Sequence, residues 1–427
     1  MTTRLLMLLT LMPWIVMPVP ALGTADQIIL TFKPEAAESD VEAVKKRFHL
    51  DHIHRFKSSH SGLFKTQTPI NELKQMVAES AGSVILDIIP NYPLEFFSPD
   101  DPYLHRQYFH QIIDTNSAWD ITRGTPKVRV AIIDSGIDYN HQDLAPNFWV
   151  NQGELGQDSQ GRDKRSNNFD DDGNGYVDDW RGWDFGNHDN DPMDEIGHGT
   201  LVAGIAGAAG NNRYGVAGIA WNLSLMGIKM SGYDQDGDHH ARLASAIQAV
   251  EYATSAGAHI LNLSWGFPLE SAHSFHIDPL KEALIAAGKR GILIIAAAGN
   301  HGANNDLTYR IPTNYKLPFL ISVAASDARD TLAEFSNYGV KHVDLAAPGV
   351  NIFTTSSKGF GSHDYRSGTS MATPMVAGTA ALLMSVYPDL RGAELRERIL
   401  SSVDTIPNWH DKIATGGRLN TLRAISP

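Results

Sequence analysis

Beyond residue 99, runs of apolar residues alternate with longer amphipathic stretches. The runs carry Val, Ile, Leu and Ala at consecutive positions, as in strands that are buried on both faces. Such strands, separated by helices, predict an α/β fold with a doubly wound, mostly parallel sheet and helices on both faces. The predicted strands are 128–136, 225–231, 259–266, 292–300 and 319–327, and the predicted helices are 242–257, 278–291, one that begins at Gly199 and one after Thr369.

A shorter region before this one predicts a small α+β unit. Its expected strands are 26–32, 62–68 and 83–90, and its expected helices are 38–50 and 69–80. The stretch 88–102 that follows is rich in Pro and acidic residues, which is typical of an extended linker.

The first 23 residues have the pattern of a signal peptide, because Arg4 precedes an apolar stretch that ends in small residues. A retained membrane anchor is the alternative, but three prolines interrupt the stretch, and a span needs about 20 apolar residues. The sequence predicts a signal peptide (1–23), a small domain (24–98) and a larger domain (99–427). We therefore expect a secreted protein, extracellular or periplasmic, that is free of the membrane after cleavage.

The composition of the chain excludes several classes of function. A formal net charge of -13 argues against nucleic acid as a partner, since phosphate backbones recruit an excess of Lys and Arg. The chain has no Cys, which excludes thiol catalysis and disulfides. An exported protein of this kind needs another source of stiffness.

Three short segments carry candidate catalytic residues: AIIDSGID around Asp134, EIGHGTLVAG around His198 and GTSMATPMVAG around Ser370. A serine hydroxyl needs a base to take its proton and an ionised group to orient that base. His198 and Asp134 supply these roles, and Asn300 in AAAGN supplies an amide donor for an oxyanion. Taken singly, each residue has an ordinary explanation as a turn former, a surface histidine or a helix cap.

In this order and spacing, the four segments resemble the subtilisin-like serine proteases, or subtilases, in the pattern of the thermitase branch. The resemblance covers the chain from about residue 100 to its end. It implies that the domain 24–98 is an inhibitory propeptide with a ferredoxin-like fold, and a permanent binding module is the alternative. Two departures are Leu201 and Met375, which stand where many relatives have His; we expect altered packing there rather than lost activity.

The resemblance also implies residues that contact substrate. Two backbone segments would hold an extended peptide, and the segment 311–318 would form a wall of the pocket for the side chain before the scissile bond. The backbone segments comprise Ser231, Gly232, Ser264, Trp265 and Gly266.

Calcium is the predicted cofactor, with no organic group. The loop 167–180 places Asp170, Asp172 and Asn174 at EF-hand-like positions, with Asp178 and Asp179 nearby, although Arg181 replaces the closing Glu. A solvated acidic turn is the alternative. The resemblance adds two sites, a tight one at Asp101, Asp143, Asn212 and the carbonyls of Ala209, Tyr214 and Val216, and a weaker one at Asp184, Asn187, Asp189 and Asp191.

The predicted function is peptide-bond hydrolysis through an acyl-enzyme, on extended polypeptides, by an enzyme made as a zymogen that its own propeptide inhibits. A catalytically silent protein that captures extended peptides is the competing hypothesis. A calcium-dependent structural protein would leave the three catalytic segments unexplained.

Overall fold

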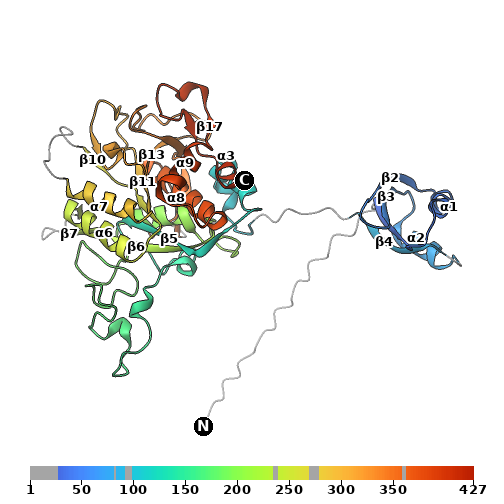
Figure 1. The fold of residues 1–427 in the computed structure, drawn as a ribbon, viewed down its shortest axis with the longest axis horizontal. Helices are drawn as coiled ribbons and strands as arrows, with labels where there is room; N and C mark the ends of the chain where they lie inside the picture. Colours follow the sequence, from blue (N-terminus) through green and yellow to red (C-terminus); the bar gives the residue numbers. More distant parts are fainter. Residues whose placement is uncertain (1–26, 81–82, 92–98, 234–238, 269–277, 358–361) are drawn as a thin grey trace, which may run out of the picture. The chain divides into compact units, whose positions relative to one another are not determined.

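The structure is a computed structural model that describes residues 27–80, 83–91, 99–233, 239–268, 278–357 and 362–427 (Figure 1). The predicted signal peptide lies outside these residues. The chain divides into two compact units, residues 1–97 and 98–427.

The first unit is a four-stranded antiparallel sheet with two helices. Its elements are β1 (Gln27–Phe32), α1 (Glu38–Phe48), β2 (Asp51–Arg55), β3 (Ser61–Lys65), α2 (Ile70–Ala78) and β4 (Ile85–Pro90). The sheet order is β2-β3-β1-β4, which with the element order βαββαβ is a split βαβ arrangement. Ile28, Leu30, Phe64 and Leu73 form its core. The sequence analysis missed β2, because all five of its residues are exposed and no apolar alternation marks it.

The second unit is built on an eight-stranded sheet with the order β17-β18-β14-β13-β11-β9-β5-β6. Its strands are β5 (Gly124–Asp134), β6 (Asn222–Lys229), β9 (Ile260–Leu263), β11 (Leu293–Ala297), β13 (Leu320–Ser326), β14 (Leu345–Pro348), β17 (Asp404–Thr405) and β18 (Gly417–Arg418). The six long strands and β18 pair in parallel, and only β17 is antiparallel. This confirms the predicted parallel sheet.

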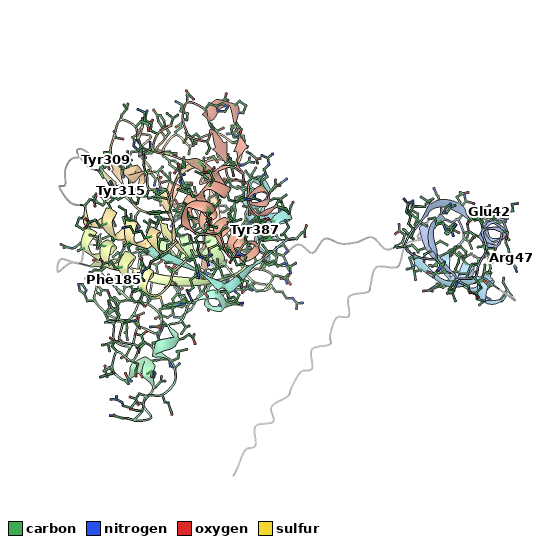
Figure 2. All side chains as sticks on the ribbon, in the orientation of Figure 1. Glu42, Arg47, Phe185, Tyr309, Tyr315 and Tyr387 are labelled. Atoms are coloured by element: carbon green, nitrogen blue, oxygen red, sulfur yellow. The ribbon has the colours of Figure 1, made fainter. Side chains whose placement is uncertain are left out.

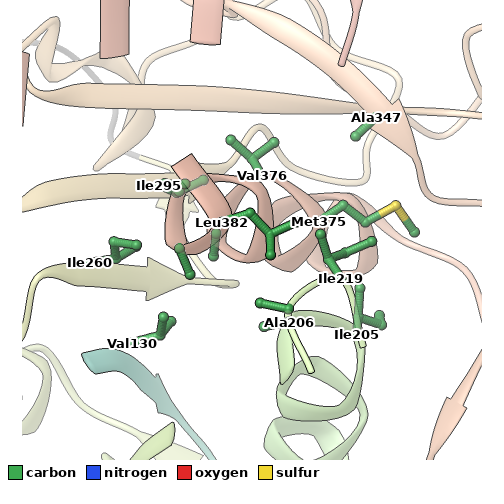
Figure 3. Packing of buried hydrophobic residues seen from close by; sticks show 14 of the residues in the cluster. Val130, Ile205, Ala206, Ile219, Ile260, Ile295, Ala347, Met375, Val376 and Leu382 are labelled. Carbon is green, nitrogen blue, oxygen red and sulfur yellow. The ribbon is translucent and has the colours of Figure 1, made fainter. Parts of the chain in front are cut away.

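Helices cover both faces of this sheet. Along β5, Val130 and Ile132 pack into one buried cluster with α5 (His198–Gly207) and α8 (Thr369–Val386), which Figure 3 shows from close by. The alternate residues Ala131 and Ile133 pack into a second cluster with α6 (Leu243–Ser255) and α7 (Pro279–Lys289). Because neighbouring residues of one strand face different helices, both faces are apolar, and this produces the continuous apolar runs in the sequence.

Smaller elements complete the unit. They are α3 (Phe109–Ile112), α4 (Thr115–Ala118), α9 (Gly392–Leu400) and α10 (Thr421–Ile425), and three two-stranded ribbons formed by β7 (Ser231–Tyr233) with β8 (His239–Ala241), β10 (Phe267–Pro268) with β12 (Arg310–Ile311), and β15 (Ile352–Thr355) with β16 (His363–Arg366).

Helix α8 is the central helix of the first cluster. Met375, Val376 and Leu382 on it are fully buried, and Leu201 of α5 belongs to the same cluster. Among the described helices, α8 alone has the length and apolar composition to cross a membrane, and 89% of its apolar window is buried inside the protein. It is therefore a core helix. The two positions where relatives often have His, Leu201 and Met375, accordingly contribute to apolar packing.

Candidate active site

The three candidate catalytic residues come from three different elements of the second unit. Asp134 is the last residue of β5, at the carboxyl edge of the sheet. His198 is the first residue of α5, and Ser370 is the second residue of α8. In doubly wound folds the carboxyl ends of the strands and the helix starts that follow them line the ligand site. The fold thus gathers the three segments at one edge.

Asp134 and His198 are in direct contact. The distance between Asp134 Oδ1 and His198 Nδ1 is 2.7 Å, and the same oxygen accepts the backbone N–H of Ser135 at 2.8 Å. Burial disfavours the charged imidazole, but the charge and hydrogen bond of Asp134 outweigh this effect and raise the pKa of His198 above its ordinary value. With Nδ1 donating to the carboxylate, Nε2 is left as the basic nitrogen.

A second buried carboxylate, Asp194, holds the start of α5. Its Oδ1 accepts from the backbone N–H of Gly197 at 2.7 Å and from the hydroxyl of Ser135 at 2.9 Å, and its Oδ2 accepts from both the N–H and the hydroxyl of Thr200. These bonds satisfy helix N–H groups on either side of His198. Sequence reasoning missed Asp194; an acid four residues before the histidine, at a helix start, was the available signal.

Ser370 and His198 line the same cavity, of about 190 Å³, together with Leu201, Arg366 and Met371. The backbone carbonyl of Ser370 accepts the hydroxyl of Ser264 at 2.9 Å. Ser370 itself is buried, with 8% of its surface exposed.

Two hydrogen bonds to the side-chain oxygen of Asn300 fix the orientation of its amide. Its Oδ1 accepts the backbone N–H of Thr369 at 2.8 Å and the hydroxyl of Thr369 at 2.9 Å. The NH₂ group is therefore turned the other way. A Cβ added to Gly368 would lie 2.9 Å from Ser370 Oγ and 3.5 Å from Asn300 Nδ2, which shows that both atoms border the same small space. This places an amide donor beside the candidate nucleophile.

The predicted substrate segments have different environments. Trp265 donates its indole N–H to the backbone carbonyl of Ile133 at 2.8 Å, next to Asp134, so the segment from Ser264 to Gly266 lies beside the catalytic residues. Ser231 is 2% exposed and pairs with Ala241 in the ribbon β7–β8, so the peptide-binding role of Ser231 and Gly232 stays a prediction.

The residues of the predicted tight calcium site lie together. The side-chain amide of Asn212 donates to Asp143 Oδ1 at 3.0 Å, and its backbone N–H donates to Asp101 Oδ1 at 3.3 Å. Asp143 accepts two backbone N–H groups, that of Val216 on Oδ2 and that of Ala209 on its carbonyl. The backbone N–H of Tyr214 donates to Asn212 Oδ1. Asp143 Oδ2 also lies 3.1 Å from His363 Nε2, a contact that the sequence did not indicate.

Next to the acidic loop 167–180 lies Glu154, a candidate calcium ligand that the sequence analysis missed. Carboxylate oxygens of Glu154, Asp170 and Asp172 lie within 4.8 Å of one another. Glu154 is fully buried, and burial raises its pKa to about 7. Its Oε1 accepts two backbone N–H groups, whereas Oε2 is buried with no hydrogen-bond partner among the described residues. Three converging carboxylates with an unpartnered oxygen fit a hard, oxygen-binding cation such as Ca²⁺.

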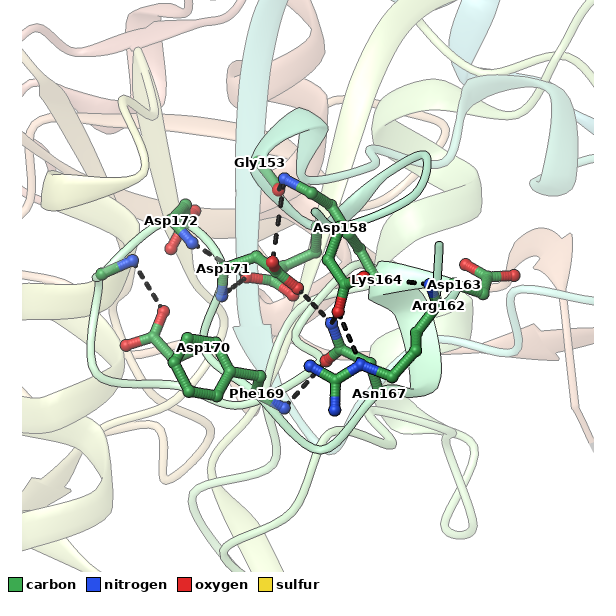
Figure 4. Close-up of polar contacts among 12 residues, drawn as sticks. Gly153, Asp158, Arg162, Asp163, Lys164, Asn167, Phe169, Asp170, Asp171 and Asp172 are labelled. Carbon is green, nitrogen blue, oxygen red and sulfur yellow. Dashed lines mark hydrogen bonds and ion pairs between the residues drawn. The ribbon is translucent and has the colours of Figure 1, made fainter. Parts of the chain in front are cut away.

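The other polar residues of the loop 167–180 form hydrogen bonds, most of them with one another. The side-chain amide of Asn174 donates to Asp172 and Asp179, and Asp178 accepts the backbone N–H of Asn168. Figure 4 shows how Asn167 contacts both Asp158 and Asp171, which folds the loop back on itself.

The predicted weaker site has a different arrangement. Asp184 is fully buried and contacts the ammonium of Lys229 at 2.8 Å, while its other contacts are N–H groups of Gly186 and Asn187. Asp191 accepts the hydroxyl of Tyr139, and Asp189 accepts the N–H of Asp191. The carboxylate of Asp184 is thus already paired with a lysine ammonium, and the weaker calcium site stays a prediction.

An α/β unit with a buried aspartate bonded to a partly exposed histidine, a serine at a helix start and an amide donor beside it is an arrangement typical of serine hydrolases. A family model described as "Peptidase_S8: Subtilase family" matches residues 125–421. The chain belongs to the subtilase family and is a serine endopeptidase.

Individual relatives agree with this assignment. The thermophilic serine proteinase of Bacillus sp. (strain AK1) is 35% identical over 339 residues, which cover 79% of this chain and 72% of that protein. Thermitase of Thermoactinomyces vulgaris is 33% identical over 330 residues, which cover 77% of this chain and 99% of thermitase. Among solved structures, a protease of Pseudoalteromonas arctica PAMC 21717 has a TM-score of 0.60 at 24% identity, covers 77% of this chain and 99% of its own, and supports the fold.

Proposed function

We propose that the chain hydrolyses peptide bonds with Ser370 as nucleophile, His198 as base and acid, Asp134 as the group that orients His198, and Asn300 as oxyanion donor. The observation that carries the proposal is the 2.7 Å contact between Asp134 and His198 at the cavity that Ser370 also lines. In a subtilase, this contact leaves the imidazole ready to accept the hydroxyl proton.

The proposed reaction has two balanced halves. Ser370 Oγ attacks the peptide carbonyl carbon while its proton passes to His198 Nε2, and the oxyanion accepts an N–H of Asn300. His198 then returns the proton to the departing amine, which leaves an ester on Ser370. Water repeats the sequence, so the ester gives a free carboxylic acid and the Ser370 hydroxyl is restored.

A fluorophosphonate probe tests this assignment. The protein should react with the probe and should cleave denatured casein, and Ser370→Ala should abolish both. Ser402→Ala is the matched control, because Ser402 is as buried as Ser370 but its hydroxyl donates to the carbonyl of Arg398, outside the catalytic segments. A folded sample that neither reacts nor cleaves would favour the silent peptide-binding protein.

We propose that Ca²⁺ stabilises the protein at the acidic loop, with Glu154, Asp170 and Asp172 as ligands. The support is the buried carboxylate of Glu154, which lies near two further carboxylates and has one oxygen without a hydrogen-bond partner among the described residues. When bound, the ion would neutralise their mutual repulsion and tie the loop together without disulfides. At about 100 times its dissociation constant, a ligand adds about 2.7 kcal/mol, or about 5 °C in melting temperature.

The calcium proposal is tested by melting curves with Ca²⁺ and with EDTA. The wild type should lose several degrees on chelation, whereas Glu154→Gln should show a much smaller difference. Glu334→Gln, which changes an exposed glutamate, should behave like the wild type. Melting curves that overlap with and without Ca²⁺ would refute the proposal.

We propose that residues 24–98 form an inhibitory propeptide of a secreted zymogen. On the sheet of the first unit, Ile29 is opposite Leu63 on one neighbour and Ile89 on the other. This row lies on the face away from Ile28 and Leu30, which form the core, and Ile89 is 40% exposed. An apolar row of this kind favours packing against another surface. Secreted protein whose N-terminus lies near residue 98 would support the proposal, and a stable chain that begins at Thr24 would support a permanent module.

A further inference from the structure

Arg310 lies on a ribbon that continues one of the segments around the nucleophile. The segment Ser264–Gly266 is bonded to the backbone of Ser370 and leads directly into β10. Strand β10 pairs with β12, and Pro268 is opposite Arg310 in this ribbon. Arg310 is therefore anchored by the segment next to the catalytic serine, immediately before the predicted pocket wall 311–318.

The second neighbour of Arg310 is the segment that carries Asn300. A Cβ added to Gly299 would lie 2.9 Å from Arg310 Nε, so the guanidinium end of the side chain lies against the bare backbone of Gly299. Gly299 also has a φ of +111°, which strongly favours glycine. The side chain of Arg310 thus reaches the residue next to the proposed oxyanion donor. Figure 2 labels Tyr309, which precedes Arg310 along the chain, and Tyr315 in the predicted pocket wall.

The Arg310 guanidinium has no acidic partner among the described residues. Arg396 and Arg418 are paired with Asp344 and Asp330, each at 2.6 Å. Three other half-buried arginines also lack an acid, but Arg129 and Arg398 donate to backbone carbonyls and Arg181 lies over aromatic rings. Among the described residues, the Arg310 guanidinium has neither kind of partner. Arg310 is half-buried, and this burial lowers its pKa. An unpaired cation in such a position costs free energy unless another group supplies the missing negative charge.

The polar side chains nearest to Gly299 do not supply that charge. Asn337 Nδ2 lies near the same point and donates to Asn305 Oδ1, and its Oδ1 already accepts the backbone N–H groups of His301 and Ala303. Asn314 Oδ1 accepts the backbone N–H of Arg310 rather than its guanidinium. The donors of the Arg310 side chain are therefore available to a ligand.

We propose that Arg310 makes the enzyme select substrates with an acidic side chain, Glu or Asp, at the residue whose carbonyl is attacked. This inference rests on the proposed catalytic roles, because Arg310 reaches Gly299, next to the proposed oxyanion donor, and its ribbon continues the segment bonded to Ser370. A guanidinium binds a carboxylate through two parallel N–H bonds, which a neutral amide of the same shape does not match.

The test compares fluorogenic peptides that differ only in that residue, which is Glu, Gln or Phe. Mature wild-type enzyme with Ca²⁺ should cleave the Glu peptide with a kcat/KM about 10- to 100-fold above the Gln peptide, as expected for a charged hydrogen-bonded pair. High salt should reduce this ratio, because the site is partly exposed to solvent. Arg310→Gln should bring the ratio close to one. Arg329→Gln, which changes an exposed arginine away from the site, should leave it unchanged.

Reaction with a fluorophosphonate shows separately that each sample has an active nucleophile. Equal cleavage of the Glu and Gln peptides by a reactive wild-type enzyme would overturn the role of Arg310, and so would a ratio that survives in Arg310→Gln. If Arg310→Gln does not fold, Arg310→Lys replaces it and should lower the ratio, because an ammonium lacks the planar pair of donors. A wild type that neither reacts nor cleaves would refute the catalytic proposal itself.

Discussion

Thr369 should control the orientation of the proposed oxyanion donor. Its hydroxyl donates to Asn300 Oδ1 at 2.9 Å and accepts the backbone N–H of Gly299 at 3.2 Å, and it is nearly fully buried. Thr369→Val keeps the shape of the side chain but removes both bonds. Only the backbone N–H of Thr369, at 2.8 Å, then fixes the amide of Asn300.

The magnitude follows from the bonds lost. One hydrogen bond contributes about 0.5–1.5 kcal/mol, so a less firmly held amide should lower kcat by about 2- to 10-fold. This stays well below the loss of about 100- to 1,000-fold that removal of an oxyanion donor causes, for which subtilisin is the standard example. Because the amide acts on the transition state, KM should change little.

The assay is the measurement of kcat and KM on one chromogenic peptide for the wild type, Thr369→Val and Thr369→Ser. The serine variant keeps the hydroxyl and should stay close to the wild type. If the valine variant retains full kcat, or if the serine variant loses as much, the hydroxyl does not orient Asn300 and the reasoning is refuted.

Three further predictions concern pH, oxyanion binding and packing. Catalysis needs a neutral His198, and Asp134 raises the pKa of His198. When the pH is lowered, kcat/KM should therefore begin to fall at a pH above the pKa of an ordinary histidine. A pH–rate profile in which kcat/KM falls only at or below that ordinary pKa would contradict this. Asn300→Ala should lower kcat by about 100- to 1,000-fold, and it should also lower the melting temperature, because the buried N–H and hydroxyl of Thr369 lose their acceptor; a change in KM alone would contradict the proposed role. Leu382→Ala should lower the free energy of unfolding by about 2–5 kcal/mol in denaturant titration, because Leu382 is fully buried on α8; a change below about 1 kcal/mol would show that the core relaxes around the gap.

The sequence by itself determined the fold class and indicated the residues proposed for catalysis. Strands buried on both faces leave continuous apolar runs. Because β5 ends at Asp134 and β11 ends three residues before Asn300, the local pattern predicted both the sheet and the edge where the proposed site lies. The two helix starts were predicted to within one residue, at Gly199 against His198 and after Thr369 against Thr369, since they depend on residues close together in the chain.

Tertiary structure alone decided which charges are paired. The ion pair between Asp184 and Lys229 and the unpartnered oxygen of Glu154 depend on segments that meet only in the folded chain. The exposed strand β2 is placed by pairing with β3 rather than by its own pattern. The position of Arg310 against Gly299 likewise depends on the ribbon β10–β12. A sequence shows which side chains are charged, but burial and neighbouring charges are set by long-range packing, and these decide whether a charge is neutralised or left to bind a ligand.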